Sequence, residues 1–471
     1  MASEKQFVDE LILRLHPEWG REKSEKLKLI HRIGDKERQE RVERMINLSA
    51  SSTIKDSLLN NHVMLPPSSE EICTSGEIVL GDVCFGRNTD GTDKIFYPLK
   101  QSFTDARSHT LISGSTGTGK STLAYNLAIQ LAQRGISVLV FDWHRSWRTL
   151  LSLDKNIYPF AKDIRVYTVG RDIHPFKGNL FFGGPKHLSM QHWLTSITGA
   201  PLQKSLLSGL GSSGLIENEA ERLIEAYESG ILKMLPNVED MKKGIEKQVL
   251  GGRPGLWRDS ALRVLSSMVR PNVREVFSSR EPIDFIKEVV DRPGITIFEM
   301  DMEFPNHLRI LLQEQLILQL MQTLLSRGES EELKVALFLE EFHHMLPQSQ
   351  IEKQVGSDLI EMLFREIRKF GGATYALTQS NSDVNNAVMS NCKTHIHFST
   401  ITFQDVSSVS NALFLKPNEI RFIDYLKPFQ CLSAIKQKTV NCLLQTRPPP
   451  PIRKVTDEEL KEISQQWQKS D

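Results

Sequence analysis

The chain has 471 residues, which is enough for one large domain with insertions or for two or three ordinary domains. Its 58 lysines and arginines balance its 58 aspartates and glutamates, so the net charge gives no indication of nucleic-acid binding. The five cysteines lack Cys-x-x-Cys spacing and fit the reduced thiols of a cytoplasmic protein. No signal peptide is visible, and charges interrupt the most apolar stretch, from Leu308, so we expect no membrane span.

Residues 1–62 are predicted to form a helical, highly charged N-terminal region. Its apolar residues recur at helical spacing, and they are Phe7, Leu11 and Leu15 in one stripe and Val42, Met45 and Ile46 in another. A small solvated helical cap is the plainer interpretation, and a module that docks a partner protein is the alternative. A linker at Leu65–Glu71 and two short strands at 76–86 and 94–99 follow.

The stretch GSTGTGKST has the spacing of a phosphate-binding loop, Gly-x-x-x-x-Gly-Lys-[Ser/Thr]. Such a loop binds phosphate because its glycines turn successive N–H groups toward one anion, while the following helix adds partial positive charge. An apolar strand at His109–Ser113 precedes the loop and helically spaced leucines follow it, as the motif requires. The predicted cofactor-binding residues are Gly114, Ser115, Thr116, Gly117, Thr118, Gly119, Lys120, Ser121 and Thr122. Lys120 is expected on the β and γ phosphates of ATP, and Ser121 on Mg²⁺.

Apolar strands alternate with helical segments through the rest of the chain. The candidate strands are 138–142, 166–170, 295–301, 334–341, 373–379 and 394–400. This alternation predicts an α/β fold whose sheet is mainly parallel and covered by helices on both faces. The predicted parts are the helical N-terminal region (1–62), the ATPase core (63–177 and 291–446), an all-α insertion (178–290) and a Pro-rich linker with a tail helix (447–471). The tail helix is expected either to pack over a neighbouring subunit or to be frayed.

Hydrolysis of ATP needs groups beyond the phosphate loop. The sequence offers three sets of candidates, which are an acidic pair, a glutamine and a pair of arginines. Glu340 and Glu341 end a buried strand, where one carboxylate can hold Mg²⁺ and its neighbour can orient or deprotonate water. Gln379 ends the next strand, and a surface amide is as good an interpretation of it as a phosphate sensor. Arg365 and Arg368 lie one helical turn apart. Either one of them reaches a transferring phosphoryl group, or both belong to a solvated basic face of the helix.

Together these segments resemble the HerA/FtsK superfamily of hexameric ATPases, and HerA more closely. The resemblance spans residues 76–445 and depends on the phosphate loop together with DWHRSW from Asp142, LFLEEFHHML from Leu337 and REIRKFGGATYALTQSNSDV from Arg365. It implies a RecA-like sheet in a ring, usually a hexamer, with ATP at subunit interfaces and DNA in a central pore. It also implies that Glu341 is the catalytic carboxylate, that Gln379 is a sensor, and that Arg365 or Arg368 reaches in from the next subunit.

The chain departs from the pattern of this family in three places. Glu340 stands where the family commonly has Asp, and the longer side chain is expected to alter metal coordination. The segment DWHRSW, from Asp142, stands where the family has Asp-x-His-Gly-Glu-Tyr. HerA-type motors usually begin with a β-barrel, whereas residues 1–62 are predicted to be helical.

The first functional interpretation is a ring-forming, ATP-driven DNA translocase or helicase-like motor. HerA-like ATPases commonly work with a nuclease, and some pair with effectors in defence against phage, so we expect a separate nuclease or effector chain. The alternative is an assembly scaffold that is switched by ATP, organises an effector and translocates little DNA. A secretion ATPase is disfavoured by the lack of a membrane anchor. Neutral charge lowers the expectation of DNA contact without removing it, because a motor touches DNA through a few pore loops.

Overall fold

The computed structural model describes residues 12, 20–46, 70–87, 92–184, 189–198, 210–346, 358–415, 420, 423, 426–435 and 440–470. The chain divides into two compact units. Unit 1 comprises Met1–Leu127 and Leu377–Pro449, and unit 2 comprises Ala128–Ala376 and Pro450–Asp471. The chain therefore crosses between the units three times, and the predicted boundaries of five parts stay a prediction.

Unit 1 contains a mixed run of strands in the order β2-β1-β11-β10-β9-β3. The strands are β1 (Ile78–Arg87), β2 (Asp93–Gln101), β3 (Thr110–Ser113), β9 (Thr394–Phe398), β10 (Gln430–Ile435) and β11 (Val440–Gln445). Among the described strand pairs of this unit, β3 and β9 are parallel, and their register puts Ser113 opposite His397. The other pairs are antiparallel. Strands β10 and β11 were not predicted from the sequence, so the expectation of a mainly parallel sheet was wrong for this part.

Short helices accompany these strands, and they are α5 (Glu70–Thr74), α6 (Phe103–Ala106), α17 (Asn386–Asn391) and α18 (Phe403–Leu413). Helix α18 packs its Val409 and Leu413 with Leu432 of β10 and Leu443 of β11 in one hydrophobic cluster. This cluster supports the turn that carries the chain into β10.

The N-terminal region is helical over the residues that the structure describes. Helix α3 (Arg21–Ile33) is followed, after Gly34, by a second helical segment at 36–46. Leu27, Val42 and Ile46 pack in one cluster with Ile12, which confirms the helical apolar stripe at Val42 and Ile46. Phe7, Leu11 and Leu15 of the other predicted stripe lie outside the described residues.

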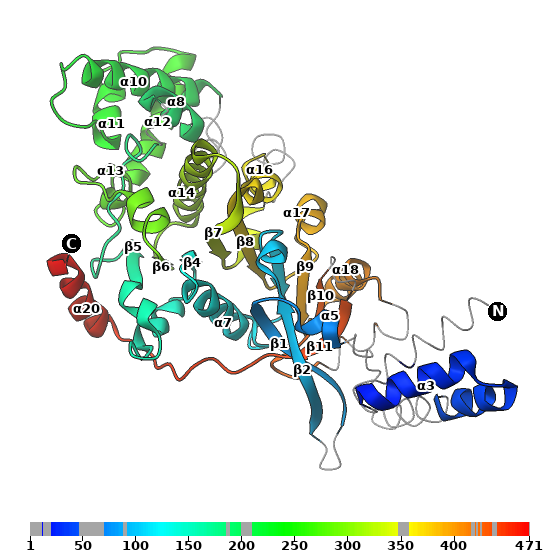
Figure 1. Cartoon of the computed structure of the whole chain (residues 1–471). Helices are drawn as coiled ribbons and strands as arrows, with labels where there is room; N and C mark the ends of the chain where they lie inside the picture. Colours follow the sequence, from blue (N-terminus) through cyan, green and yellow to red (C-terminus); the bar gives the residue numbers. More distant parts are fainter. Residues whose placement is uncertain are drawn as a thin grey trace. The chain divides into compact units, whose positions relative to one another are not determined.

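Unit 2 contains the parallel strands, in the order β8-β7-β4-β6-β5 (Figure 1). They are β4 (Ser137–Asp142), β5 (Arg165–Val169), β6 (Gly294–Met300), β7 (Ser330–Leu339) and β8 (Phe370–Thr378), whose last two residues belong to unit 1. Every residue of β4, β5 and β6 is buried, as expected of parallel strands covered on both faces. The predicted α/β fold, with a large sheet flanked by helices, is confirmed.

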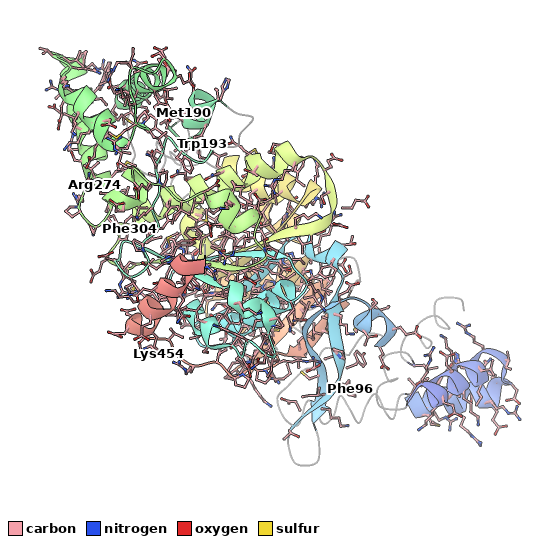
Figure 2. All side chains as sticks on the ribbon, turned by 60° about the vertical axis from the view of Figure 1, so that its left-hand side comes forward. Phe96, Met190, Trp193, Arg274, Phe304 and Lys454 are labelled. Atoms are coloured by element: carbon pink, nitrogen blue, oxygen red, sulfur yellow. The ribbon has the colours of Figure 1, made fainter. Side chains whose placement is uncertain are left out.

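The helices of unit 2 include α14 (Asn306–Arg327), α16 (Asp358–Glu366) and the helices of the predicted insertion. The latter are α8 (Met190–Ile197), α10 (Leu210–Glu228), α11 (Val238–Glu246), α12 (Arg253–Met268) and α13 (Arg274–Ser278). Figure 2 labels Phe304, which packs on Gly170 at the end of β5 and lies 6.4 Å from the ring of Phe277 in α13. Phe304 thereby ties the helical insertion to the strand ends. None of the helices that the structure describes is both long and apolar enough to cross a membrane.

The C-terminal helix α20 (Asp457–Ser470) packs on unit 2 of its own chain. Trp467 is buried, with the guanidinium of Arg165 4.9 Å from its ring centroid and His174 5.1 Å away. At the start of the helix, Asp457 accepts hydrogen bonds from Arg148 and Arg171. The helix is therefore docked within its own chain and is not frayed, and its packing over a neighbouring subunit stays a prediction.

Replacing Asp457 by Asn is expected to loosen α20. Hydrogen bonds from Arg171 first, and then from Arg148, lower the pKa of Asp457 to about 2, so the carboxylate is ionised above that pH. Because the folded-state pKa lies below the unfolded one, its stabilisation is present above about pH 4 and is lost as the pH falls toward 2. For a partly exposed carboxylate we expect a loss of about 1 kcal/mol at neutral pH, or roughly fivefold faster amide hydrogen exchange in α20. The exposed neighbour Glu458→Gln is the matched control, and equal exchange in both variants would contradict the prediction.

Candidate functional site

The phosphate loop lies between β3 and helix α7 (Lys120–Ala132), as the motif requires. Gly114, Gly117 and Gly119 have φ values of 141°, 78° and 118°, which side chains rarely adopt. A Cβ atom on Gly114 would lie 2.6 Å from Cβ of Phe398, so only glycine fits there. The predicted order of strand, glycine loop and helix is confirmed.

Lys120 folds back over this loop. Its Nζ donates to the carbonyl oxygens of Gly114 at 2.5 Å and Ser115 at 2.9 Å, and Thr118 Oγ1 donates to the same Ser115 oxygen at 2.7 Å. The loop thus holds an ammonium group beside the N-terminus of a 13-residue helix. Both features attract an anion, so the residues present fit the phosphates of a nucleotide. Ser121, in the first turn of α7, offers a hydroxyl of the kind that binds Mg²⁺ in such loops.

Gln379 lies against the phosphate loop. Its Oε1 accepts a hydrogen bond of 3.1 Å from Thr116 Oγ1, although 263 positions separate the two residues in the sequence. The structure therefore brings Gln379 and the loop together within unit 1, and its role as a sensor stays a prediction.

His397 is a buried residue beneath the loop that sequence reasoning missed. Its Nδ1 lies 2.6 Å from Ser113 Oγ, one residue before Gly114. Burial first, and then the nearby His395, lower the pKa of His397 well below 6.5, so the ring is neutral at neutral pH. The sequence showed only alternation in THIHFST, and the burial of both histidines follows from the central place of β9 between β10 and β3.

In unit 2, Glu340 is buried directly after β7, with 4% of its surface exposed. Its Oε1 accepts a hydrogen bond of 2.8 Å from the Trp147 indole N–H, and its Oε2 accepts one of 3.3 Å from the Trp143 backbone N–H. Burial first, and then the neighbouring carboxylate of Asp142, raise the pKa of Glu340 well above 4.5. The predicted metal ligand therefore has both oxygens engaged within the protein here.

Asp142 ends β4 and fixes the loop that follows it. Its carboxylate accepts hydrogen bonds from the backbone N–H groups of His144 at 2.9 Å and Trp147 at 2.8 Å. Further along, Arg148 forms a bidentate pair with Glu299 of β6. The segment from Asp142 to Arg148 is thus tied to β6 as well as to Glu340.

Glu341 has a left-handed backbone conformation, with φ 46° and ψ 44°. Such a conformation costs roughly 1–3 kcal/mol in a non-glycine residue and often marks a functional position. Its Oε1 lies 2.9 Å from His144 Nε2, and its Oε2 lies 3.3 Å from His343 Nδ1. Two imidazoles therefore flank a nearly buried carboxylate, an arrangement that can accept and pass on a proton. Among the residues that the structure describes, no three His, Cys, Asp or Glu side chains gather as a metal-binding group.

The two predicted arginines lie at the opposite end of the strands from Glu341. Arg365 is on α16 and Arg368 on the next turn, both just before β8, whereas Glu341 follows the end of the parallel strand β7. Between these ends, the five β7 residues from Val335 to Leu339 pair with β8, and at about 3.3 Å per residue they separate the ends by roughly 15 Å or more. Arg365 is exposed and pairs with Glu361 of its own helix at 3.1 Å. Within one chain, neither arginine is therefore brought to Glu341.

Comparison with known proteins agrees with this geometry. Residues 95–207 match the family described as "Helicase HerA, central domain". The fold is similar to VirB4 of Thermoanaerobacter pseudethanolicus, with a TM-score of 0.59 and 14% identity over 80% of this chain and 97% of that chain. Residues 95–207 are thus similar to the HerA central domain, and the fold over most of the chain is similar to that of the VirB4 structure.

The bacterial conjugative coupling protein TrwBdeltaN70 also has a fold similar to that of this chain. Its TM-score is 0.54 at 15% identity, and the match covers 77% of this chain and 89% of that chain. The plasmid coupling protein TrwB in complex with ADP and Mg²⁺ matches with a TM-score of 0.53 at 14% identity, over the same shares of the two chains. These likenesses show the fold. No curated protein sequence matches the chain.

His397 is expected to make the folded protein sensitive to mild acid. Because its pKa is lowered in the folded state, the unfolded chain binds more protons below about pH 6.5, and stability falls as the pH falls from there. The melting temperature of the wild type should therefore drop between pH 7 and pH 5.5, and His397→Gln should flatten that part of the profile. The exposed His192→Gln is the control, and an unchanged slope in the His397 variant would count against the prediction.

Glu340→Gln is expected to fold, whereas Glu340→Ala is expected to be strongly destabilised. Burial and the Asp142 carboxylate favour the neutral form of this carboxyl, and an amide is neutral as well and its oxygen still accepts the Trp147 hydrogen bond. Alanine leaves a cavity and an unpaired indole N–H, with an expected loss of about 3 kcal/mol or more. Thermal unfolding followed by tryptophan fluorescence measures both, with the exposed Glu331→Gln as control. If glutamine is as damaging as alanine, Glu340 is ionised in the folded protein.

Proposed function

We propose that this chain is a ring-forming, ATP-hydrolysing DNA translocase of the HerA type that acts in the cytoplasm with a partner nuclease or effector, including one of anti-phage defence. The proposal depends on the geometry of the phosphate loop. Lys120 donates hydrogen bonds to carbonyl oxygens of the loop, and Thr116 of the loop donates one to Gln379. A loop built in this way serves a nucleoside triphosphate and has little use in a purely structural protein.

The residues divide the work of hydrolysis as follows. Lys120 and the loop N–H groups would hold the phosphates, and Ser121 would offer its hydroxyl to Mg²⁺, which when bound would neutralise their charge. Glu341 takes the proton of the attacking water, and His144, 2.9 Å from its Oε1, orients that carboxylate. Gln379 leaves Thr116 to meet the terminal phosphate. Glu340 acts on Mg²⁺ only if the Trp143 and Trp147 hydrogen bonds are released.

The place of the arginines supports the proposal of a ring. A transferring phosphoryl group needs added positive charge, and Arg365 and Arg368 lie at the other end of the strands from Glu341 in the same chain. An arginine of the neighbouring subunit supplies that charge when subunits close into a ring, usually a hexamer in this family. Completion of each site by the next subunit couples the sites around the ring.

DNA is the proposed load. The solved structures with similar folds include proteins described as conjugative coupling proteins, and the matched family is described as a helicase. One of these structures is a complex with ADP and Mg²⁺ and another a complex with a non-hydrolysable ATP analogue, which supports the same cofactors here.

The second candidate is an ATP-switched scaffold that organises an effector and translocates little DNA. The engagement of both Glu340 oxygens within the protein favours it, because a carboxyl held in this way is slow to serve the metal. The equal numbers of basic and acidic residues favour it as well.

ATP turnover with and without double-stranded DNA separates the two candidates. The motor predicts DNA-stimulated turnover by a hexamer-sized particle in light scattering, and a fall of at least roughly 100-fold in Lys120→Ala and Glu341→Gln. The exposed Lys155→Ala is the control. A ring whose turnover stays near background with any DNA would establish the scaffold instead.

Mixing of two inactive variants tests the arginine in trans. Arg365→Ala or Arg368→Ala combined with Glu341→Gln should recover activity, because some interfaces of a mixed ring contain both intact groups. The neighbouring Lys369→Ala should be active alone. If neither arginine variant loses activity alone, the trans arginine lies elsewhere.

A further inference from the structure

Phe429 is an exposed aromatic residue in a strained conformation beside the phosphate loop. Its φ is 68°, in the left-handed region that a bulky side chain rarely adopts, and 44% of its surface is exposed. It lies in the turn directly before β10. A strained, half-exposed phenylalanine contributes little to a core, so its conformation calls for another explanation.

Both backbone groups of Phe429 are fixed by unit 1. Its N–H donates to the Thr118 carbonyl of the phosphate loop at 2.7 Å, and its carbonyl accepts from the Thr446 N–H at 2.8 Å and from Thr446 Oγ1 at 2.9 Å. The next residue, Arg447, forms a bidentate pair with Asp82, and its carbonyl accepts a hydrogen bond from Asn126 of α7 at 2.8 Å. The backbone is therefore held on one side by the loop and on the other by the segment that follows β11.

The ring of Phe429 packs on the last glycine of the loop. A Cβ atom on Gly119 would lie 3.0 Å from Cδ1 of Phe429 and 3.1 Å from Cε1 of Phe398. Phe398 is fully buried, whereas Phe429 is half exposed, so the two rings have different roles beside the loop. Phe398 fills the space under the loop, whereas Phe429 leaves part of its surface open to solvent beside Gly119.

We propose that Phe429 is the stacking platform for the base of the bound nucleotide. This inference rests on the proposed function, because it requires the phosphates to be held at Gly119–Ser121. The base of a nucleoside triphosphate lies one sugar away from its phosphates, within reach of an aromatic ring fixed at the edge of the same loop. A base is a flat π-system, and a partly exposed ring held by its backbone stacks on it without losing further conformational freedom.

Stacking of this kind also sets the specificity. Every base has a π-face, so a ring without hydrogen-bonding groups gives affinity and little discrimination between adenine and guanine. Base stacking on an aromatic side chain is worth roughly ten- to a hundredfold in affinity. The site is therefore expected to bind ATP and GTP within about tenfold of each other, and inorganic tripolyphosphate more weakly than either.

Calorimetric titration of the full chain with ATP and with inorganic tripolyphosphate, each with Mg²⁺, tests the platform. Phe429→Ala should weaken ATP binding about tenfold or more and leave tripolyphosphate binding unchanged, and Phe429→Tyr should restore ATP binding. The matched control is Phe414→Ala, because Phe414 is also left-handed, with φ 52°, and 87% exposed, but it ends α18.

The outcomes separate this inference from the proposed function. If Phe429→Ala weakens both ligands equally, Phe429 only shapes the loop and the platform is wrong. If it weakens neither, the base lies elsewhere and the platform is also wrong. If the wild type binds neither ligand, or Lys120→Ala binds as the wild type does, the proposed function itself fails.

Discussion

The buried carboxyl of Glu340 is the contact on which the acidic part of the site depends. A carboxyl at this depth is costly unless its oxygens are paired, and both pair with the segment that follows β4. That segment carries His144, which in turn orients Glu341. The position of the proposed catalytic base is thus set by a neighbour that points into the protein, and the strands β4 and β7 supply the rigid frame on which both depend.

Strained backbone recurs among the candidate site residues of both units. Outside glycine, left-handed residues in the described part of the chain include Arg145, Glu341 and Phe429, and each is held by a specific contact. The guanidinium of Arg145 pairs with Asp301, Glu341 with His144, and the Phe429 N–H with the phosphate loop. Because such conformations persist only where the surroundings over-determine them, these contacts explain how the site keeps geometries that the free chain avoids.

The sequence correctly predicted those parts of the molecule that depend on local residue patterns. The glycine spacing fixed the phosphate loop, and apolar runs gave the parallel strands, because buried strands of this kind need little else. Strands β10 and β11 were missed, since their pairing is antiparallel and joins segments without a strong local signal. His397, Trp147 and Phe429 were missed for a different reason. Their importance comes from neighbours that are distant in sequence, and a single sequence does not record those contacts.

Two departures from the family pattern turn out to lie in contact with each other. In the resemblance to Asp-x-His-Gly-Glu-Tyr, Arg145 takes the place of the glycine and Trp147 that of the tyrosine, while Glu340 takes the place of an aspartate. The glycine position still has a positive φ, 56°, now in an arginine whose guanidinium is held by Asp301. The longer Glu340 side chain reaches the Trp147 indole at 2.8 Å. An aspartate is one methylene shorter, so Glu340 and Trp147 are better understood as one paired change than as two separate ones. The pairing directs the Glu340 carboxyl into the protein, which is why the proposal gives the role of catalytic base to Glu341.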